Sequence, residues 1–169
     1  MTDEVEKKQI EDRATAGDVA AQIYLGWAYG GYGPWKKDDS LAELWLRRAA
    51  ASNDIEGKRR LCRWLYDHAR NETKPTANDL VAAGDFYGYY VIAHLYLHGD
   101  CGVCRNRHLG LVHLQKAADL GHLVSALDLM RQESRWGLLN PLKLPRLLVL
   151  SSTILYLLLC HPRSLKVYR

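Results

Sequence analysis

The stretch at residues 17–29, GDVAAQIYLGWAY, returns 67 residues later at residues 84–96 as GDFYGYYVIAHLY. After a loop the match continues at an offset of 68, because the later copy gains one residue. The paired positions include Leu25 and Ile92, Gly26 and Ala93, Tyr29 and Tyr96, Ala42 and Gly110, and Leu46 and Leu114. Self-similarity at a fixed offset is the sequence signature of a repeat architecture.

Two weaker copies complete the series. One starts at Asn53 and places Leu61 where the first copy has Leu25, and another starts at Gly121 and runs through Leu129. The repeat length is therefore about 36 residues, which is the range of repeats built from helix pairs.

Each copy predicts two helices. The first has apolar residues at helical spacing, namely Ala21, Leu25, Ala28 and Tyr29, and ends in a glycine-rich connection at residues 30–34. The second starts at a cap formed by Asp38, Asp39 or Ser40, and its apolar stripe is Leu41, Ala42, Trp45, Leu46 and Ala49. One such pair cannot bury its own stripes, so neighbouring pairs must stack.

The runs GDVAAQIYLGWAYGGYG, DDSLAELWLRRAA and HLYLHGDCGVCRNRHLGLVHLQKAADLGH resemble Sel-one-like repeats, which are relatives of the tetratricopeptide repeat. The resemblance covers roughly residues 16–130. It implies an all-α fold, a right-handed α-solenoid of stacked antiparallel helix pairs that serves as a protein–protein adaptor or scaffold. It implies no catalytic residues, because the family pattern is structural.

The predicted layout has six segments. The first segment, residues 1–15, is a lead-in segment whose helix is expected at about residues 4–16. The repeats follow at 16–52, 53–83, 84–120 and 121–135, and we call them the first to fourth repeats. The tail is 136–169. The second repeat departs from the pattern, because residues 71–75 replace the glycine loop and its second helix is expected only at about residues 76–83. In the third repeat His113 stands where the first has Trp45.

Charge and N-terminal composition bear on the kind of partner and on the cellular compartment. Residues 1–136 carry 18 Lys and Arg against 19 Asp and Glu, so the charge gives little support to a nucleic-acid partner. The N-terminus is charged with both signs and has no apolar core of a secretory signal. We therefore expect a cytoplasmic protein whose four cysteines are reduced.

Cys101 and Cys104, with His98, His108 and His113 nearby, could supply part of a zinc site. A structural site usually needs a second close pair, so we expect a loop with two incidental thiols and no cofactor. Cys62 takes a small-residue position and is expected to be a buried, inert thiol.

An enzyme, such as a hydrolase using His94, His98 and the 101–104 loop, is the remote alternative. The G-x-S-x-G, G-x-x-x-x-G-K and H-E-x-x-H motifs are all absent, so we do not expect an enzyme.

The clue to binding lies on the predicted first helices, on the side away from the apolar stripe. The candidate partner-binding residues are Trp27, Arg59, Arg63, Tyr66, Tyr87, Tyr90, His94 and Arg131, with Ile23 and Leu127 in the same rows. Aromatic residues and arginine dominate binding hot spots, and arginine suits carboxylates. The hypothesis is a concave groove that binds a peptide or protein with an acidic feature.

Two kinds of alternative stand beside it. The apolar members of these rows could pack one repeat on the next, and the arginines could form a solvated face. At the level of function, the alternative to an adaptor is a specific inhibitor, such as an immunity-type protein that blocks one partner.

The tail differs in composition. Residues 137–169 carry five Lys and Arg and no acid, and residues 147–160 are 14 uncharged residues with Ser151, Ser152 and Thr153 among them. A spanning helix needs about 20 apolar residues. The alternatives are a closing helix over the last repeat, a short membrane anchor, and a terminus foreign to the repeat fold, for example from a shifted reading frame.

Overall fold

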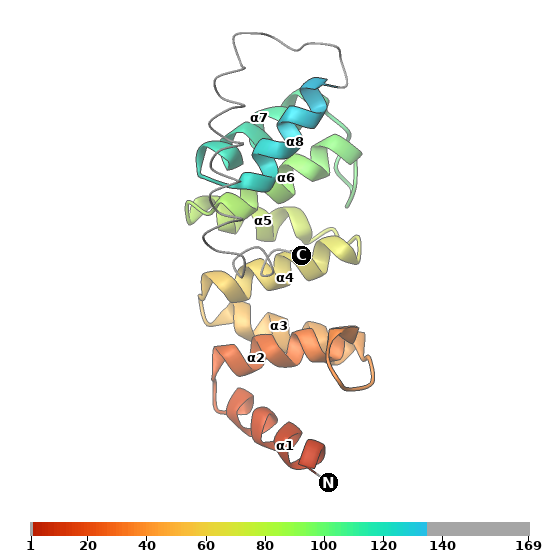
Figure 1. Cartoon of the computed structure of the whole chain (residues 1–169), viewed down its shortest axis with the longest axis vertical. Helices are drawn as coiled ribbons and strands as arrows, with labels where there is room; N and C mark the ends of the chain where they lie inside the picture. Colours follow the sequence, from red (N-terminus) through yellow and green to blue (C-terminus); the bar gives the residue numbers. More distant parts are fainter. Residues whose placement is uncertain (1, 135–169) are drawn as a thin grey trace, which may run out of the picture. The chain divides into compact units, whose positions relative to one another are not determined.

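Eight α-helices and one π-helical turn, with no strand, form the regular structure of residues 2–134, the part of the chain that the computed structural model describes (Figure 1). The elements are α1 (Thr2–Thr15), α2 (Val19–Trp27), the π turn η1 (Ala28–Tyr32), α3 (Asp39–Ala51), α4 (Ile55–Asp67), α5 (Thr73–Ala82), α6 (Phe86–His98), α7 (Arg107–Asp119) and α8 (Leu123–Ser134). The chain divides into residues 1–129 and 130–169, and of the latter the described residues form the end of α8.

Within residues 1–129, each helix from α1 to α6 packs against the next one in the chain, as Figure 1 shows. The helices α2 and α3, α4 and α5, and α6 and α7 form the three predicted pairs, and α1 is the predicted lead-in helix. The fold is therefore an α-helical repeat stack, as the sequence indicated.

The repeat positions form the core. Leu25, Tyr29 and Ile92 are buried, and Tyr96 is half-buried. Small residues let the helices approach closely: a Cβ on Gly57 would stand 2.6 Å from the Ala49 carbonyl oxygen. Apolar residues that recur at matching intervals are thus hidden by stacking.

The junction before each first helix has one conformation. Gly17, Gly84 and Gly121 have φ of 97°, 74° and 91°, and Asn53 at the same repeat position has φ of 63°. Glycine and asparagine tolerate this left-handed region best. The aspartates that follow the first three junctions in the chain cap the next helix with their side chains: Asp18, Asp54 and Asp85 accept from Ala21, Gly57 and Tyr87 amides.

The predicted start of α5 was wrong. The helix begins at Thr73, three residues before the expected position, and its first turn includes Pro75. Proline is tolerated there because the first amides of a helix have no intrahelical acceptor. The glycine-rich connection ends α2 as expected, but through the π turn, in which Gly31 has φ of 92°.

The loops of the first and third repeats close with the same bond. The Asp38 amide donates to the Tyr29 carbonyl at 2.9 Å, and the Asn106 amide donates to the Tyr96 carbonyl at 2.8 Å. The extra residue of the third repeat lies between these two ends, which explains the change of offset from 67 to 68.

The predictions for the tail, including a membrane contact through residues 147–160, lie outside the described residues. In residues 2–134 no helix has the length and apolar character that crossing a bilayer requires.

Candidate partner-binding surface

The predicted binding positions recur on the first helices. One repeat position is occupied by Trp27, Arg63 and His94, and a second by Ile23, Arg59 and Tyr90. Trp27 and Arg63 are exposed, and the other four are half-buried. We use the name α4–α6 surface for the five residues Arg63, Tyr66, Tyr87, Tyr90 and His94.

The tyrosines of the α4–α6 surface are anchored in the core. Tyr66, Tyr87 and Tyr90 all pack against the buried cluster that contains Cys62 and Ile92. The rings of Tyr87 and Tyr90 lie 5.9 Å apart. Burial raises the pKa of all three phenols, so each hydroxyl stays protonated at neutral pH and can donate a hydrogen bond. Their conformations are fixed before a partner arrives.

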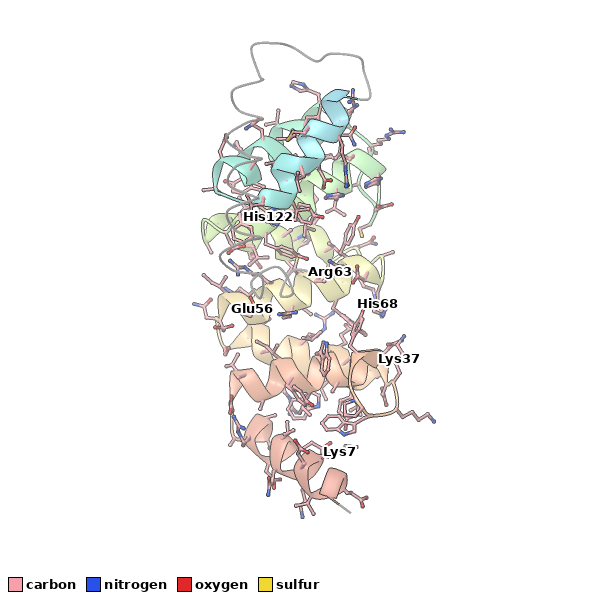
Figure 2. All side chains as sticks on the ribbon, in the orientation of Figure 1. Lys7, Lys37, Glu56, Arg63, His68 and His122 are labelled. Atoms are coloured by element: carbon pink, nitrogen blue, oxygen red, sulfur yellow. The ribbon has the colours of Figure 1, made fainter. Side chains whose placement is uncertain are left out.

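Arg63 is exposed on α4 (Figure 2). Its Nε donates to Asp67 Oδ2 at 2.7 Å within the same helix, and this bond raises the pKa of the guanidinium. An exposed pair of this kind contributes only about 0–1 kcal/mol. Arg63 can therefore exchange Asp67 for a carboxylate of a partner at little cost.

Arg59 has a different environment. Its Nε donates to Asp85 Oδ1 and Oδ2 at 3.2 and 3.1 Å, and its guanidinium lies 4.8 Å from the centre of the Phe86 ring. The arginine thus joins α4 to the start of α6. A partner contact at Arg59 stays a prediction, and its guanidinium is already bonded.

His94 is half-buried between other polar groups. Its Nε2 lies 3.6 Å from Asp128 Oδ2, beyond hydrogen-bond distance, and its Nδ1 lies 3.4 Å from His98 Nε2. Its ring meets Tyr90 edge to face at 4.5 Å. Burial lowers the pKa of His94, with Asp128 opposing and His98 adding to the effect. His94 is therefore neutral at pH 7.

His122 also lies in this region and was not predicted from the sequence. Its Nδ1 lies 2.7 Å from Ser125 Oγ, and its ring stacks on Phe86 at 4.9 Å. The signal was present, because His122 follows the Gly121 junction where the other repeats have a capping aspartate. Both His122 and Ser125 are buried, so this His–Ser pair is closed to a substrate.

The first repeat carries a second aromatic group, Trp27 and Tyr24, of which only Trp27 was predicted from the sequence. Trp27 keeps 42% of its surface exposed, too much for a residue that seals one repeat against the next. Tyr24 is also exposed, and the two rings lie 5.5 Å apart. Arg131 is exposed on α8, in the part of the chain after residue 129.

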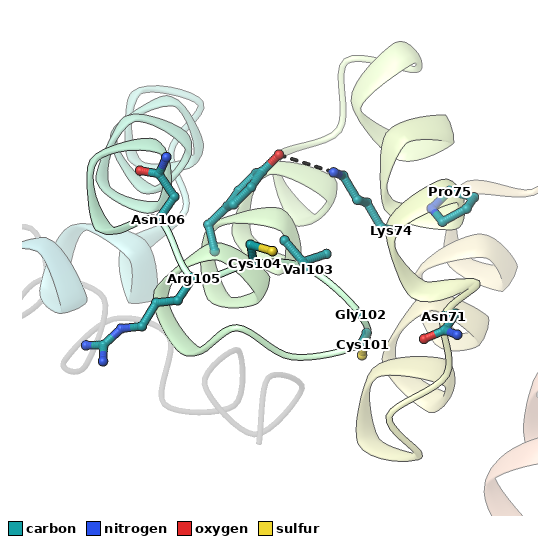
Figure 3. A pocket seen from close by; sticks show the side chains of 10 residues that line it. Asn71, Lys74, Pro75, Cys101, Gly102, Val103, Cys104, Arg105 and Asn106 are labelled. Carbon is teal, nitrogen blue, oxygen red and sulfur yellow. Dashed lines mark hydrogen bonds between the residues drawn. The ribbon is translucent and has the colours of Figure 1, made fainter.

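The cysteines differ in environment. Cys62 is fully buried, as expected, and burial raises the pKa of its thiol to about 12, which disfavours the reactive thiolate. Cys101 is half-buried and Cys104 exposed, and both are free thiols that line an open pocket (Figure 3). Within residues 2–134, no three His, Cys, Asp or Glu side chains are placed to hold a metal ion. No hydrogen bond between described residues joins either thiol to His94 or His98.

Parts of the chain are similar to a known repeat family and to solved structures. The model of the Sel1 repeat matches residues 19–54 and 86–122, which lie in the first and third repeats and the start of the next repeat in each case. Sel1 repeats generally mediate protein–protein interactions and typically form scaffolds without catalysis. No curated protein sequence matches the chain significantly.

Two solved structures share the fold. The protective antigen c5321 of uropathogenic Escherichia coli, which displays an SLR fold, is 21% identical with a TM-score of 0.65. The match covers 78% of this chain but only 29% of that protein. A Sel1 repeat protein from Oxalobacter formigenes is 25% identical with a TM-score of 0.54, and the match covers 73% of this chain and 96% of that one.

Proposed function

We propose that this chain, which carries Sel1 repeats at residues 19–54 and 86–122, is an adaptor that binds a protein partner on its α4–α6 surface. One observation carries the proposal: an exposed arginine lies on the same surface as three tyrosines whose inner sides are held by the core. Aromatic residues and arginine contribute most of the free energy of protein binding. Side chains that are already ordered lose little entropy when a partner binds.

The surface favours a partner segment with one acidic residue beside an apolar one. Arg63 can bond the carboxylate, because its pair with Asp67 is weak. The tyrosine rings offer apolar faces and protonated hydroxyls. Asp100 and Asp128 act electrostatically on Tyr66 and Tyr90. The surface is thus mixed in charge, which suits a single acidic residue better than a polyanion.

The test is affinity capture with the intact chain under reducing conditions, comparing the wild type with the double variant R63E/Y90A. Loss of two hot-spot contacts should lower the amount of the true partner more than tenfold, which corresponds to at least about 1.4 kcal/mol. Each captured protein is then purified and its Kd measured against both chains. If every captured protein binds both chains equally, the proposal is wrong.

Arg60 supplies the matched control. It lies on the same helix, and its Nε donates to Glu56 Oε1 at 2.7 Å in an exposed pair like that of Arg63. R60E makes the same change of charge near the same helix, and we expect it to leave Kd unchanged. Thermal unfolding of all three chains separates loss of binding from loss of fold. A single tight partner would indicate a specific inhibitor, and several weaker ones an adaptor.

A further inference from the structure

An open pocket of about 590 Å³ lies between the start of α5 and the loop that joins α6 to α7 (Figure 3). Lys74 and Asn71 line one side, and Arg105 and Asn106 line the other, as Figure 3 shows. Pockets that bind small molecules have volumes of about 300–1,000 Å³. The volume of the pocket is therefore suitable for a small ligand.

The same corner occurs where the lead-in helix α1 meets the first repeat, and equivalent residues build it. The Lys7 amine lies 5.3 Å from the centre of the Tyr29 ring, and 67 residues later the Lys74 amine lies 5.1 Å from the centre of the Tyr96 ring. In the first repeat Trp35 fills the corner, with its ring 5.4 Å from that of Tyr29. Tyr29 is consequently buried, whereas Tyr96 is only half-buried.

The residue that fills the corner differs between the two repeats. Trp35 stands three residues before Asp38, and Val103 stands three residues before Asn106, the two residues whose amides close the loops. Val103 therefore takes the place of Trp35. A valine is much smaller than an indole, and both Val103 and Tyr96 line the pocket.

The charge of the corner differs as well. At the first corner, Glu11 on α1 accepts from the Tyr29 hydroxyl at 2.7 Å and pairs with Lys7 at 3.9 Å. The residue 67 positions after Glu11 is Asn78, which carries no charge. The Lys74 amine bonds the Tyr96 hydroxyl at 3.2 Å (Figure 3) and forms no ion pair with a carboxylate among the described residues.

The other charges around the pocket have the same sign. Arg105 is exposed at the rim and has no ion pair within residues 2–134, and no acidic side chain lines the pocket. Asp100 belongs to the same loop but lies outside the lining. His113 stacks on Tyr96 at 5.9 Å, and the charges of Lys116 and Lys74 add to burial in lowering its pKa.

We propose that this pocket binds a small organic anion, with a flat apolar ring in the space that an indole fills in the first repeat and its carboxylate or phosphate between Lys74 and Arg105. Ammonium and guanidinium groups bind both kinds of anion through charge-assisted hydrogen bonds. The long side chain of Arg105 can fold over the ligand, and Asn71 adds a hydrogen-bonding amide. The proposal is independent of the α4–α6 surface.

The test is titration of the intact chain with benzoate and with phenyl phosphate, followed by amide chemical shifts and by calorimetry. Benzamide, which has the shape of benzoate without its charge, is the control ligand. We expect either anion to shift the amides of residues 96–106 saturably, and benzamide to bind at least tenfold more weakly. The tighter of the two anions identifies the ligand class. Equal binding of benzamide, or no shift with either anion, would overturn the proposal.

Variants test the origin of the pocket. V103W restores the indole of the first repeat and should abolish binding, and N78E restores the carboxylate beside Lys74 and should weaken binding more than tenfold. K37Q is the matched control for R105Q, because Lys37 and Arg105 share a repeat position. R105Q should weaken binding and K37Q should not. Asn78 is exposed, so N78E remains informative if V103W does not fold. Unchanged affinity in N78E and R105Q would contradict the proposal.

Discussion

The helix pair α4–α5 and the two pairs on either side of it have the same architecture but different sequences. The flanking pairs match the Sel1 model, whereas residues 55–85 do not. The middle pair nevertheless retains the left-handed junction at Asn53, the Asp54 cap and the buried Leu65. It has lost the glycine loop, and a short turn with Ala69 at φ of 50° replaces it. The helix-pair fold thus persists in the middle pair without the glycine loop.

The middle pair also connects the cores of its neighbours. Leu61, Trp64 and Leu65 belong to the core cluster that contains Leu25, while Cys62 on the same helix belongs to the cluster that contains Ile92. If α4 joins two cores, damage to it should affect both flanking repeats.

The largest effect is expected from L65A. Leu65 is fully buried, and removing a buried leucine side chain typically costs about 2–5 kcal/mol. Chemical denaturation followed by circular dichroism should show one transition, shifted to lower denaturant. L44A is the control, because Leu44 is exposed and the substitution should cost less than about 0.5 kcal/mol. Two separate transitions in L65A would show that the middle pair is only a spacer.

The second prediction compares two capping aspartates. Asp18 lies in the first repeat, and Asp85 lies where the middle pair meets the third repeat. D85N should destabilise the chain by about 1–3 kcal/mol, because it leaves the half-buried Arg59 with only its longer pair to Glu56 at 3.4 Å. D18N should have a much smaller effect, since its partner Arg13 is exposed. Asparagine keeps the helix cap in both variants. Equal free energies of unfolding for the two variants would remove the special role of the Arg59–Asp85 pair.

The third prediction concerns the junction position that the repeats share. G84A should cost about 1 kcal/mol, because alanine is strained at φ of 74°. N53G gives the middle pair the glycine that its neighbours have, and should change the stability by less than about 1 kcal/mol. Thermal melts of both variants measure this. If N53G were as harmful as G84A, the Asn53 side chain would have a role of its own.

The smallest effect is expected from pH. Burial lowers the pKa of His94 and His122 below the ordinary value of about 6.5. The unfolded chain therefore binds more protons just below that pH, and stability should fall as the pH is lowered from about 6.5 towards 5.5. The effect fades above about pH 7.5, where these histidines are neutral in the unfolded chain as well.

The control for this prediction is H122N, because asparagine is a good N-cap residue and does not titrate. Its melting temperature should depend less on pH than that of the wild type over the same range. The first Sel1 stretch, residues 19–54, contains no histidine, so the sensitivity belongs to the third and fourth repeats. An identical slope for H122N and the wild type would assign the pH dependence to other groups.

Most of the fold could be predicted from the sequence, because stacking leaves repeat positions little freedom. Leu25, Tyr29 and Ile92 are buried for the same reason that they recur. The start of α5 could not be read correctly, since Pro75 was taken as a residue before the helix. A proline in the first turn has no effect on helical hydrogen bonds, so its presence alone does not locate the boundary.

The candidate site was predictable only in part. The exposed positions of Arg63 and Trp27 follow from helical periodicity. The bonds of Arg59 to Asp85 could not be foreseen, because they join residues 26 positions apart in different repeats. The pocket beside Tyr96 was also hidden. The pocket exists because the small Val103 stands where the first repeat has the large Trp35. This difference becomes visible only when the two loops are aligned.

The bond between the Tyr96 carbonyl and the Asn106 amide closes the loop between α6 and α7. The loop can therefore change in length while the two helices keep their packing. Val103 in this loop is buried in the core, whereas Cys104 and Arg105 are exposed, and longer loops add little closure entropy. This protein therefore offers a graft point: a reporter peptide or an epitope inserted between Cys104 and Arg105 should leave Val103 and the helices in place. By the same route, descendants of an ancestral repeat could acquire new ligands through changes of single loop residues.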